Sequence, residues 1–510
     1  MKQQWRARKT VAMYESDMAK SGLKRVLGKW SLTALGIGSV IGAGIFVMTG
    51  LAAKDFAGPA LALSFVIAGM GCAFAGLCYA EFASIIPVEG SAYAYSFATV
   101  GELFAWIIGW DLILEYSMAS STVAVGWSGY FLKLLGLFHV HLPLWLSNDL
   151  YTARMLLEEA AANGSMAELT AQYSSIHLPT LFGMPIAINL PSVVICSIIT
   201  YILLRGIKEA ANTNLLIVII KVGVVLFVII AGAFYIDPTN WDPFIPARGL
   251  NSQGIMAYGY AGVMAGAAYV FFAYIGFDAV STQAGEARNP RKDVPFGLLV
   301  SLLICTVLYI SVSLVVTGMV KYTDMDVKAP LAAAFSDYGL NIAVWLISIA
   351  AVAGLTSVLL VQMLAQSRLF LAMAKDGLLS RKIFAELHPR TRVPYRGTAL
   401  VGAAVAITSG LIPIETIAKL VNIGTLFAFV MVSIAVMVMR QREPNVKRPF
   451  KVPYLYVIAP LSILFNLGMM VSLGWENWLR LGLWLLLGLI IYLVYGRKHS
   501  IMRKTEELKS

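Results

Sequence analysis

The sequence predicts an all-α integral membrane protein with twelve transmembrane helices, and three observations support this fold class. First, 59% of the 510 residues are hydrophobic, 13% are charged, and the mean hydropathy of +0.76 lies far outside the range of soluble domains. Second, apolar runs of about 20 residues, the length that crosses roughly 30 Å of hydrocarbon, recur along the chain. Third, most basic residues lie between these runs, as the positive-inside rule expects.

The apolar runs divide the chain into predicted spans and loops. The spans lie at 31–53, 59–86, 102–131, 191–207, 210–235, 258–286, 296–320, 341–373, 397–412, 416–440, 455–474 and 479–496. Residues 1–30 are polar and basic and lack the short apolar stretch of a signal peptide, so we expect them to stay attached as an N-terminal tail. Residues 497–510 form the predicted C-terminal tail.

The distribution of charge predicts the topology. Of the 39 Lys and Arg, 29 lie in the two tails and in the loops that would share their side, and eight lie on the opposite side. The remaining two, Lys221 and Arg368, lie within spans. This asymmetry predicts that both termini are cytoplasmic. It also accounts for the net charge of +11 without a nucleic-acid partner.

Neither a disulfide framework, a metal site nor a catalytic site is suggested. The four cysteines fall inside apolar runs, where we expect small packing residues. All five histidines lie in predicted loops or tails, and no nucleophile with a base and no metal-ligand cluster is visible. We therefore expect no cofactor and no metal, and we do not expect an enzyme.

Glycines interrupt two of the predicted spans. In the first span Gly36, Gly38, Gly42 and Gly44 follow one another closely, and each weakens a helix by about 1 kcal/mol relative to alanine. Small residues also permit close helix packing, so this span alone leaves two interpretations open. The sixth span, five spans later, again places a glycine, Gly276, near its centre. That spacing is typical of two five-helix repeats of inverted topology whose discontinuous first helices face each other at the midplane.

The repeat predicts the domain organisation. We expect a first five-helix repeat at 31–235, a second at 258–440, and two further helices at 455–496. A long outer loop at 138–185 contains one amphipathic stretch, Asp149 to Tyr173, and we expect a cap or spacer there rather than a separate binding domain.

Broken helices expose backbone groups that lipid cannot satisfy, so each break must line a cavity or a bound polar solute. N–H groups at the start of one half-helix suit a carboxylate, and carbonyl groups at the end of another suit an ammonium. Such a site would bind both ends of an α-amino acid. The residues expected to bind substrate through the breaks are Ile41, Gly42, Ala43, Gly44, Ile45, Phe272, Ala273 and Ile275, with the donors at 43–45.

Charged side chains also lie deep within predicted spans, where each costs several kcal/mol and normally faces a cavity or a partner. Lys221 is near the middle of span five, and Glu115 is similarly placed in span three. The alternative is a structural role, in which Lys221 belongs to an ion pair or extends its side chain to the membrane–water interface. A buried lysine can supply the charge of a sodium ion and can release a proton. Inverted repeats with broken helices are typical of secondary transporters. We therefore hypothesise that this protein carries its solute across the membrane, and that Lys221 and Glu115 make this transport proton-coupled and sodium-independent. Asp111 and Asp278 are either relay groups or structural partners.

Several short motifs occur in order along the chain. They are Tyr79-Ala80-Glu81-Phe82, Gly90-Ser91-Ala92-Tyr93, Leu114-Glu115-Tyr116, Gly276-Phe277-Asp278, Gly285-Glu286-Ala287-Arg288-Asn289-Pro290 and Ala372-Met373-Ala374-Lys375-Asp376-Gly377. Together they resemble the amino acid–polyamine–organocation superfamily, and within it a bacterial member of the cationic amino acid transporter family. The likeness covers nearly the whole chain.

The resemblance implies a secondary transporter that takes up L-amino acids by alternating access at the plasma (inner) membrane. It also implies the five-plus-five inverted repeat with two extra C-terminal helices. Lys221 matches the span-five lysine that takes the place of a sodium ion in proton-coupled members. Glu115 matches a span-three acid next to the substrate pocket. The outer loop at 138–185 looks longer than is usual for bacterial members.

A side-chain pocket around Phe272, Thr356 and Met363 would be mostly apolar, which favours neutral or broad amino acid specificity. An arginine or lysine transporter and an amino acid/polyamine exchanger of the same fold are the alternatives. A transceptor or the light chain of a heteromeric transporter is a different class. No cysteine lies in a predicted outer loop, so we expect no disulfide-linked heavy chain. The expected partners are an amino acid, H⁺ and the lipid bilayer.

Overall fold

The computed structural model describes residues 27–86, 91–205, 211–251, 254, 256–282, 287–327, 329–389, 391 and 393–503. The predictions made for the tail before residue 27, for the motif residues Gly90, Gly285 and Glu286, and for residues 504–510 lie outside these described residues. Within them, the chain is mainly helical.

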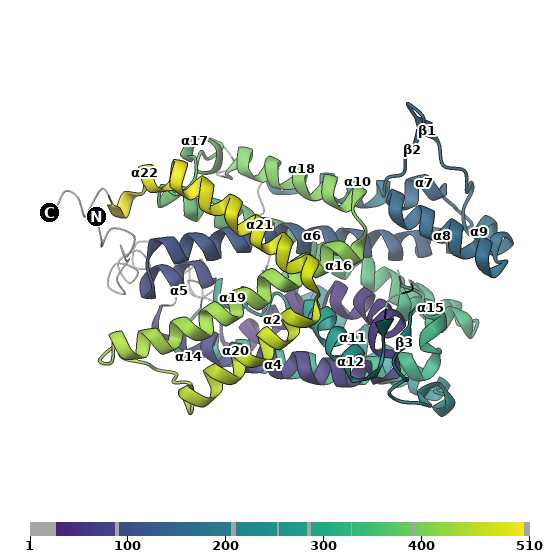
Figure 1. Cartoon of the computed structure of the whole chain (residues 1–510), viewed down its shortest axis with the longest axis horizontal. Helices are drawn as coiled ribbons and strands as arrows, with labels where there is room; N and C mark the ends of the chain where they lie inside the picture. Colours follow the sequence, from purple (N-terminus) through teal and green to yellow (C-terminus); the bar gives the residue numbers. More distant parts are fainter. Residues whose placement is uncertain are drawn as a thin grey trace.

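Long helices run side by side along the longest axis of the molecule and form a bundle (Figure 1). They are α2 (Lys29–Val40), α4 (Leu61–Ile85), α6 (Glu102–Leu137), α10 (Leu190–Arg205), α11 (Ala211–Gly232), α12 (Gly259–Val270), α14 (Pro290–Met319), α16 (Asn341–Lys375), α18 (Tyr395–Leu411), α19 (Ile414–Arg442), α20 (Leu455–Ser472) and α21 (Trp475–Ile491). Every predicted span corresponds to one of these helices or to a helix that is interrupted.

Shorter elements complete the described chain. They are η2 (Gly44–Met48), α3 (Thr49–Ala52), η3 (Ala53–Ala57), η4 (Gly58–Ala60), α5 (Ser91–Thr99), α7 (Leu144–Ser147), α8 (Leu150–Asn163), α9 (Met166–Gln172), β1 (Thr180–Leu181), β2 (Met184–Pro185), η5 (Ala233–Tyr235), η6 (Pro238–Trp241), β3 (Gly249–Leu250), β4 (Met256–Ala257), η7 (Phe271–Tyr274), α13 (Ala279–Thr282), η9 (Tyr322–Asp324), α15 (Pro330–Asp337), α17 (Arg381–Phe384), η10 (Tyr492–Gly496) and α22 (Arg497–His499). The segments labelled η are single turns of 3₁₀- or π-helix.

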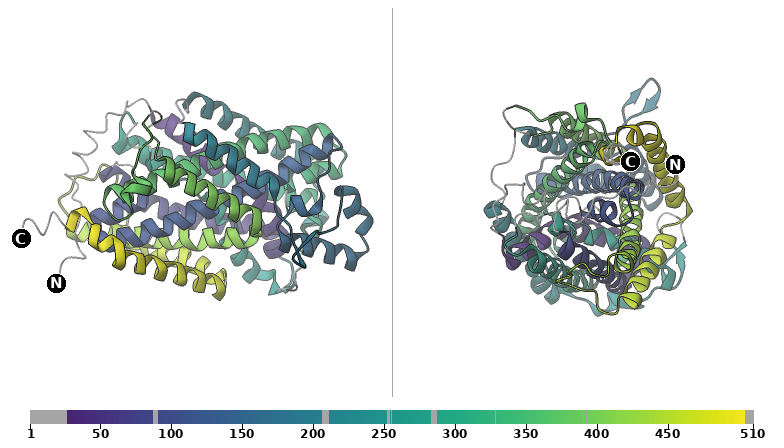
Figure 2. Two further views of the ribbon diagram at one scale, coloured as in Figure 1. Left: turned by 90° about the horizontal axis from the view of Figure 1, so that it is seen from above. Right: turned by 90° about the vertical axis from the view of Figure 1, so that its left-hand side faces the viewer.

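The bundle has two distinct ends. α5, α17 and α22 lie at one end, here called the α22 end, and α8, α9 and α15 lie at the other, here called the α8 end (Figure 1). Seen along the bundle axis, the long helices surround α6 and neighbouring segments rather than forming a single layer (Figure 2). By length and composition, seven helices of the described chain could each cross a membrane.

The segment at the α8 end has a small core of its own. The amphipathic stretch predicted there forms α8 and α9. Asp149 starts α8 by accepting a hydrogen bond from the Thr152 backbone N–H at 3.0 Å, and Gly164 ends it with φ of 72°. The buried apolar side chains of this segment are Leu144, Ala153, Ala160, Leu169, Tyr173 and Ala187, and they form a cluster separate from the main core.

Candidate functional site

Two segments of the bundle are interrupted near their middle. α2 ends at Val40, and helical geometry resumes at Ala43, so Ile41 and Gly42 form the first break. η7 ends at Tyr274, and residues 275–278 form a turn that constitutes the second break before α13. Each break lies where the glycine pattern predicted a discontinuous helix.

The two breaks lie against each other. A Cβ atom on Gly44 would lie 2.1 Å from the Cα of Ala273, so only a glycine permits this approach. A Cβ atom on Gly276 would lie 2.9 Å from the carbonyl oxygen of Ser39, and Gly276 has φ of 105°, a conformation that disfavours other residues. The half-helix after the first break therefore packs on the end of η7, while the second break packs on the end of α2.

Side chains from neighbouring helices satisfy backbone groups at the breaks. The Tyr309 hydroxyl, on α14, lies 2.8 Å from the carbonyl oxygen of Val40 and 2.9 Å from that of Ala273. The Asn422 side chain, on α19, donates to two carbonyl oxygens of α12 at 2.9 Å. Neither residue was predicted from the sequence. Each is a polar group within an apolar span, and that isolation is the signal that could have found them.

Lys221 is held against the end of α2. The side chain is 1% exposed, and its Nζ donates to the carbonyl oxygen of Gly38 at 3.0 Å. A Cβ atom on Gly354, in α16, would lie 2.9 Å from the Cε of this lysine, so the absent side chain provides space for it. Lys221 is therefore enclosed within the bundle, and its charge lies about one turn before the first break.

Glu115 lies in a different environment, beside the second break. Glu115 is 2% exposed, lies near Asp278 and Asp111, and is within hydrogen-bonding reach of the Thr425 hydroxyl. Among the described residues, both carboxylate oxygens of Asp111 and the Oε2 atom of Glu115 are buried without a hydrogen-bond partner. No ion pair between Lys221 and Glu115 occurs in the described structure. The two charged groups thus lie beside different half-helices.

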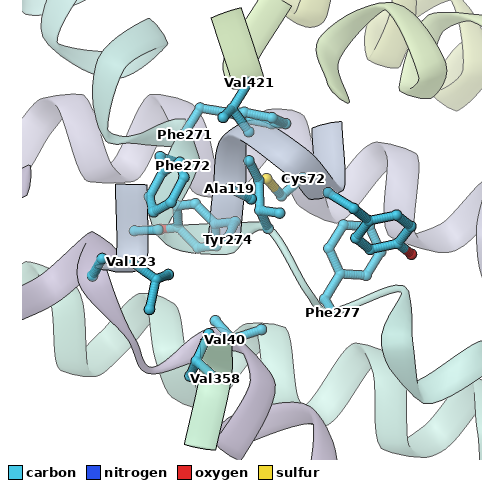
Figure 3. Close-up of a cluster of buried hydrophobic side chains, with 14 of the residues drawn as sticks. Val40, Cys72, Ala119, Val123, Phe271, Phe272, Tyr274, Phe277, Val358 and Val421 are labelled. Atoms are coloured by element: carbon cyan, nitrogen blue, oxygen red, sulfur yellow. The ribbon is translucent and has the colours of Figure 1, made fainter. Parts of the chain in front are cut away.

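Apolar side chains fill the space around the breaks. Figure 3 shows side chains converging there from several helices: Val40 from α2, Ala119 and Val123 from α6, Phe272 from η7, Val358 from α16 and Val421 from α19. All of these are buried. Thr356, one of the predicted pocket residues, is partly buried, and its hydroxyl accepts a hydrogen bond from the Trp127 indole at 2.9 Å.

The structure brings most of the predicted site residues together. The eight residues predicted at the breaks, 41–45, 272, 273 and 275, are all buried where the two interrupted segments meet. Two of the predicted carbonyl acceptors already have partners, because Phe272 accepts from the Ile275 N–H at 3.1 Å and Ala273 accepts from Tyr309. Each carbonyl oxygen retains a second lone pair. Met363 is fully buried in α16.

Comparison with known proteins decides the family. The model of the amino acid permease family matches residues 27–479. The chain belongs to the amino acid permease family. This family lies in the amino acid–polyamine–organocation superfamily, so the assignment made from the sequence motifs is confirmed.

Three relatives show how this permease compares with characterised transporters. It is 45% identical over 482 residues to the branched-chain amino acid permease BcaP of Bacillus subtilis, covering 94% of this chain and 95% of the relative. It is 43% identical to the methylthioribose transporter of the same organism, covering 98% and 99%. It is 38% identical to cationic amino acid transporter 3, mitochondrial, of Arabidopsis thaliana, covering 81% and 62%. Cationic amino acid transporters are therefore among its relatives, and the two bacterial relatives are more similar to it.

The family and the helices together define the class of protein. The relatives are transporters rather than enzymes, and the described chain contains several helices that are long and apolar enough to cross a bilayer. This permease is a multi-pass membrane protein, and its family implies that its substrate is an amino acid.

Proposed function

We propose that this permease imports neutral L-amino acids, above all those with branched apolar side chains, across the plasma membrane. The observation that carries the proposal is the contact between the two breaks, where Gly44 packs on Ala273. At this place the first N–H groups of one half-helix and the last carbonyl groups of another share one small region. Such groups complement a carboxylate and an ammonium, so the backbone itself selects an α-amino acid.

The side chains around the breaks support an apolar specificity. Val40, Val123, Phe272 and Val358 offer aliphatic and aromatic surface and no charge to a substrate side chain. Glu115, the acid that could recognise a cationic substrate, lies near Asp278 and Thr425 beside the second half of the sixth span. The similarity to a branched-chain amino acid permease points in the same direction. An arginine or lysine transporter is therefore the less favoured alternative.

The proposed architecture has twelve spans, with two five-helix repeats of inverted topology at 31–235 and 258–440 and two further helices at 455–496. The interrupted segments would be the first helix of each repeat, and alternating access would arise from movement of one set of helices around the breaks. The concentration of Lys and Arg in the tails and in the loops on their side supports a cytoplasmic location for both termini in this architecture.

We further propose that transport is proton-coupled and independent of sodium. Lys221 already donates to the Gly38 carbonyl oxygen at the end of α2, where a bound cation would otherwise be needed. Loss of its proton would remove the charge that strengthens this hydrogen bond and would loosen the hold of Lys221 on the end of the half-helix. Proton binding at Lys221, with Glu115 as the second proton-binding group, would thereby change the affinity of the break for substrate.

Uptake into empty proteoliposomes tests the proposal. With an acidic exterior and no sodium, radiolabelled leucine should accumulate, unlabelled valine or isoleucine should compete, and arginine should not. Lys221→Met should abolish the response to the pH gradient, whereas Lys419→Met, at a lysine paired with Glu415, should retain it. Accumulation of methylthioribose without leucine would contradict the amino acid assignment. Uptake only into vesicles preloaded with amino acid would contradict net import and indicate exchange.

A further inference from the structure

A β-hairpin at the α8 end exposes apolar side chains on its tip. Strands β1 and β2 pair antiparallel, with Leu181 opposite Met184, and a two-residue turn joins them. The turn residues Phe182 and Gly183 both have positive φ, 52° and 78°, as in the type I′ turns that normally carry Asn-Gly. Phe182 thus occupies a conformation that bulky residues rarely adopt.

The exposure of this tip is extreme for apolar residues. Phe182 is 93% exposed, Met184 is 67% exposed and Leu181 is 54% exposed. Phe182 gains almost no packing against the described residues from this placement, and it adopts an unfavourable backbone conformation. An apolar environment outside the chain would account for both features.

The position of the hairpin identifies that environment. In Figures 1 and 2 the hairpin projects sideways from the bundle, beyond the helices beneath it, instead of continuing along the bundle axis. It leads directly into α10, whose exposed large side chains continue the apolar surface along one side of the bundle. They are Leu190, Val194, Ile198, Tyr201 and Ile202. No Asp, Glu, Lys or Arg lies between His177 and Arg205, whereas α8 and α9 carry charged residues.

We propose that the hairpin at 180–185 is a membrane anchor that inserts its tip into the lipid leaflet at the α8 end of the bundle. Leu181, Phe182 and Met184 would enter the boundary between headgroups and acyl chains, as apolar residues of interfacial segments do. The apolar surface of α10 continues this contact toward the middle of the bilayer. The anchor holds the 138–189 segment against the membrane surface and restricts its position over the α8 end of the bundle.

A second copy of the chain is the competing occupant. Each strand of the hairpin has two residues, and the tip exposes three large apolar side chains, whereas a stable interface usually buries about 20 to 30 residues per partner. The uncharged connection to the lipid-facing side of α10 also favours lipid over protein.

Site-specific fluorescence in nanodiscs that hold one full-length copy tests the anchor. The four native cysteines are buried, so Thr180→Cys on the hairpin can be labelled selectively with an environment-sensitive dye while Phe182 stays in place. Ala162→Cys, on the exposed side of α8, is the matched control at the same end of the molecule. Quenching by a lipid carrying a spin label near its headgroup is compared with quenching by aqueous iodide.

We expect the dye at position 180 to be quenched by the spin-labelled lipid and to be at least ~3-fold less sensitive to iodide than the dye at position 162, because lipid excludes the anion. Adding Phe182→Asn, which suits the turn, should raise the iodide sensitivity at 180 toward that at 162. Equal iodide quenching at 180 and 162 with Phe182 present would overturn the proposal. If the dye at position 180 were protected from iodide only in discs that hold two copies, the tip would contact a second chain instead of lipid. If Phe182→Asn left this protection unchanged, Phe182 would not be the anchor.

Discussion

The hydroxyl group of Tyr309 lies 2.9 Å from the carbonyl oxygen of Ala273, which is near the end of the first half of the interrupted sixth span. The same hydroxyl lies 2.8 Å from the carbonyl oxygen of Val40, at the end of α2. One side chain on α14 therefore connects the ends of both interrupted helices. Because the last carbonyl groups of a helix have no partner within it, this contact stabilises two helix ends that would otherwise be unsatisfied in an apolar interior.

We predict that Tyr309→Phe lowers stability by about 1–3 kcal/mol, because two buried carbonyl groups lose the single hydroxyl proton that they share while the ring is retained. The uptake rate should fall by about tenfold, since the relative position of the two breaks is no longer fixed. Thermal unfolding of the purified protein and initial uptake rates measure the two effects. Tyr338→Phe is the control: that hydroxyl also contacts two carbonyl oxygens, at 3.1 and 2.9 Å, but it is partly exposed, so water can replace it. Equal losses in both variants would contradict a special role for Tyr309.

We predict that Gly44→Ala abolishes substrate binding. The new methyl group would overlap the Cα of Ala273, so the two interrupted segments must separate, at a cost of about 1–3 kcal/mol for overpacking. Gly482→Ala in α21 is the control, because beyond its own helix backbone the added Cβ would meet no atom of the described residues within 4 Å. That change should leave binding intact and stabilise the helix by up to ~1 kcal/mol. Substrate-induced thermal stabilisation of both variants is the measurement, and normal binding by Gly44→Ala would show that the breaks do not form the site.

The helices could be predicted from a local rule, and the interruptions from a local rule together with the recurrence of glycine five spans later. The length of an apolar run determines whether a segment can span the bilayer, and clustered glycines weaken a helix wherever they occur. The family followed from motifs in their order. The burial of Lys221 could be anticipated in the same way, since its distance from both ends of the span prevents the side chain from reaching an interface.

Other features could not be predicted because they depend on which distant residues meet. Tyr309 and Asn422 stand out as single polar residues in apolar spans, but their partners lie more than 30 and 150 positions away in the chain, and no local pattern reveals which residues they contact. The sequence also did not predict that Lys221 and Glu115 lie beside different half-helices, because depth in a span does not specify the direction of the side chain. The hairpin at 180–185 lay within a loop for which only an amphipathic stretch was predicted.

We predict that Gly354→Ala impairs uptake driven by a pH gradient, because it displaces Lys221, while it changes the stability of the protein little. The added Cβ would lie 2.9 Å from the lysine Cε, and a flexible side chain can move by a few tenths of an ångström, so the cost in stability should stay within about 1 kcal/mol. The hydrogen bond from Nζ to the Gly38 carbonyl oxygen should lengthen, and uptake driven by a pH gradient should fall several-fold. Gly223→Ala lies on the same helix as Lys221, and its added Cβ would contact only its own helix backbone in the described part of the chain, so this change should be neutral. Unchanged pH-driven uptake in Gly354→Ala would indicate that Lys221 is purely structural.

The last prediction concerns the α22 end, where the end of the described chain is tied to the start of α6. Arg503 Nε donates to Glu102 Oε1 at 3.0 Å, the Tyr492 hydroxyl donates to the same oxygen at 2.9 Å, and the Ser500 hydroxyl donates to Oε2. Glu102 is fully buried and Arg503 nearly so. Arg503→Ala should therefore destabilise the protein by about 3–5 kcal/mol, because the carboxylate would remain buried without its cation.

A surface pair and a double variant distinguish this explanation from a general effect of lost charge. Arg480→Ala removes the partner of Glu476 in an exposed pair and should cost less than ~1 kcal/mol. Adding Glu102→Gln to Arg503→Ala removes the uncompensated charge, so it should restore part of the lost melting temperature. The opposite outcome is that the losses of stability in Arg503→Ala and Glu102→Gln simply add in the double variant. The two side chains would then act independently, and the ion pair would not be what fixes this end of the chain.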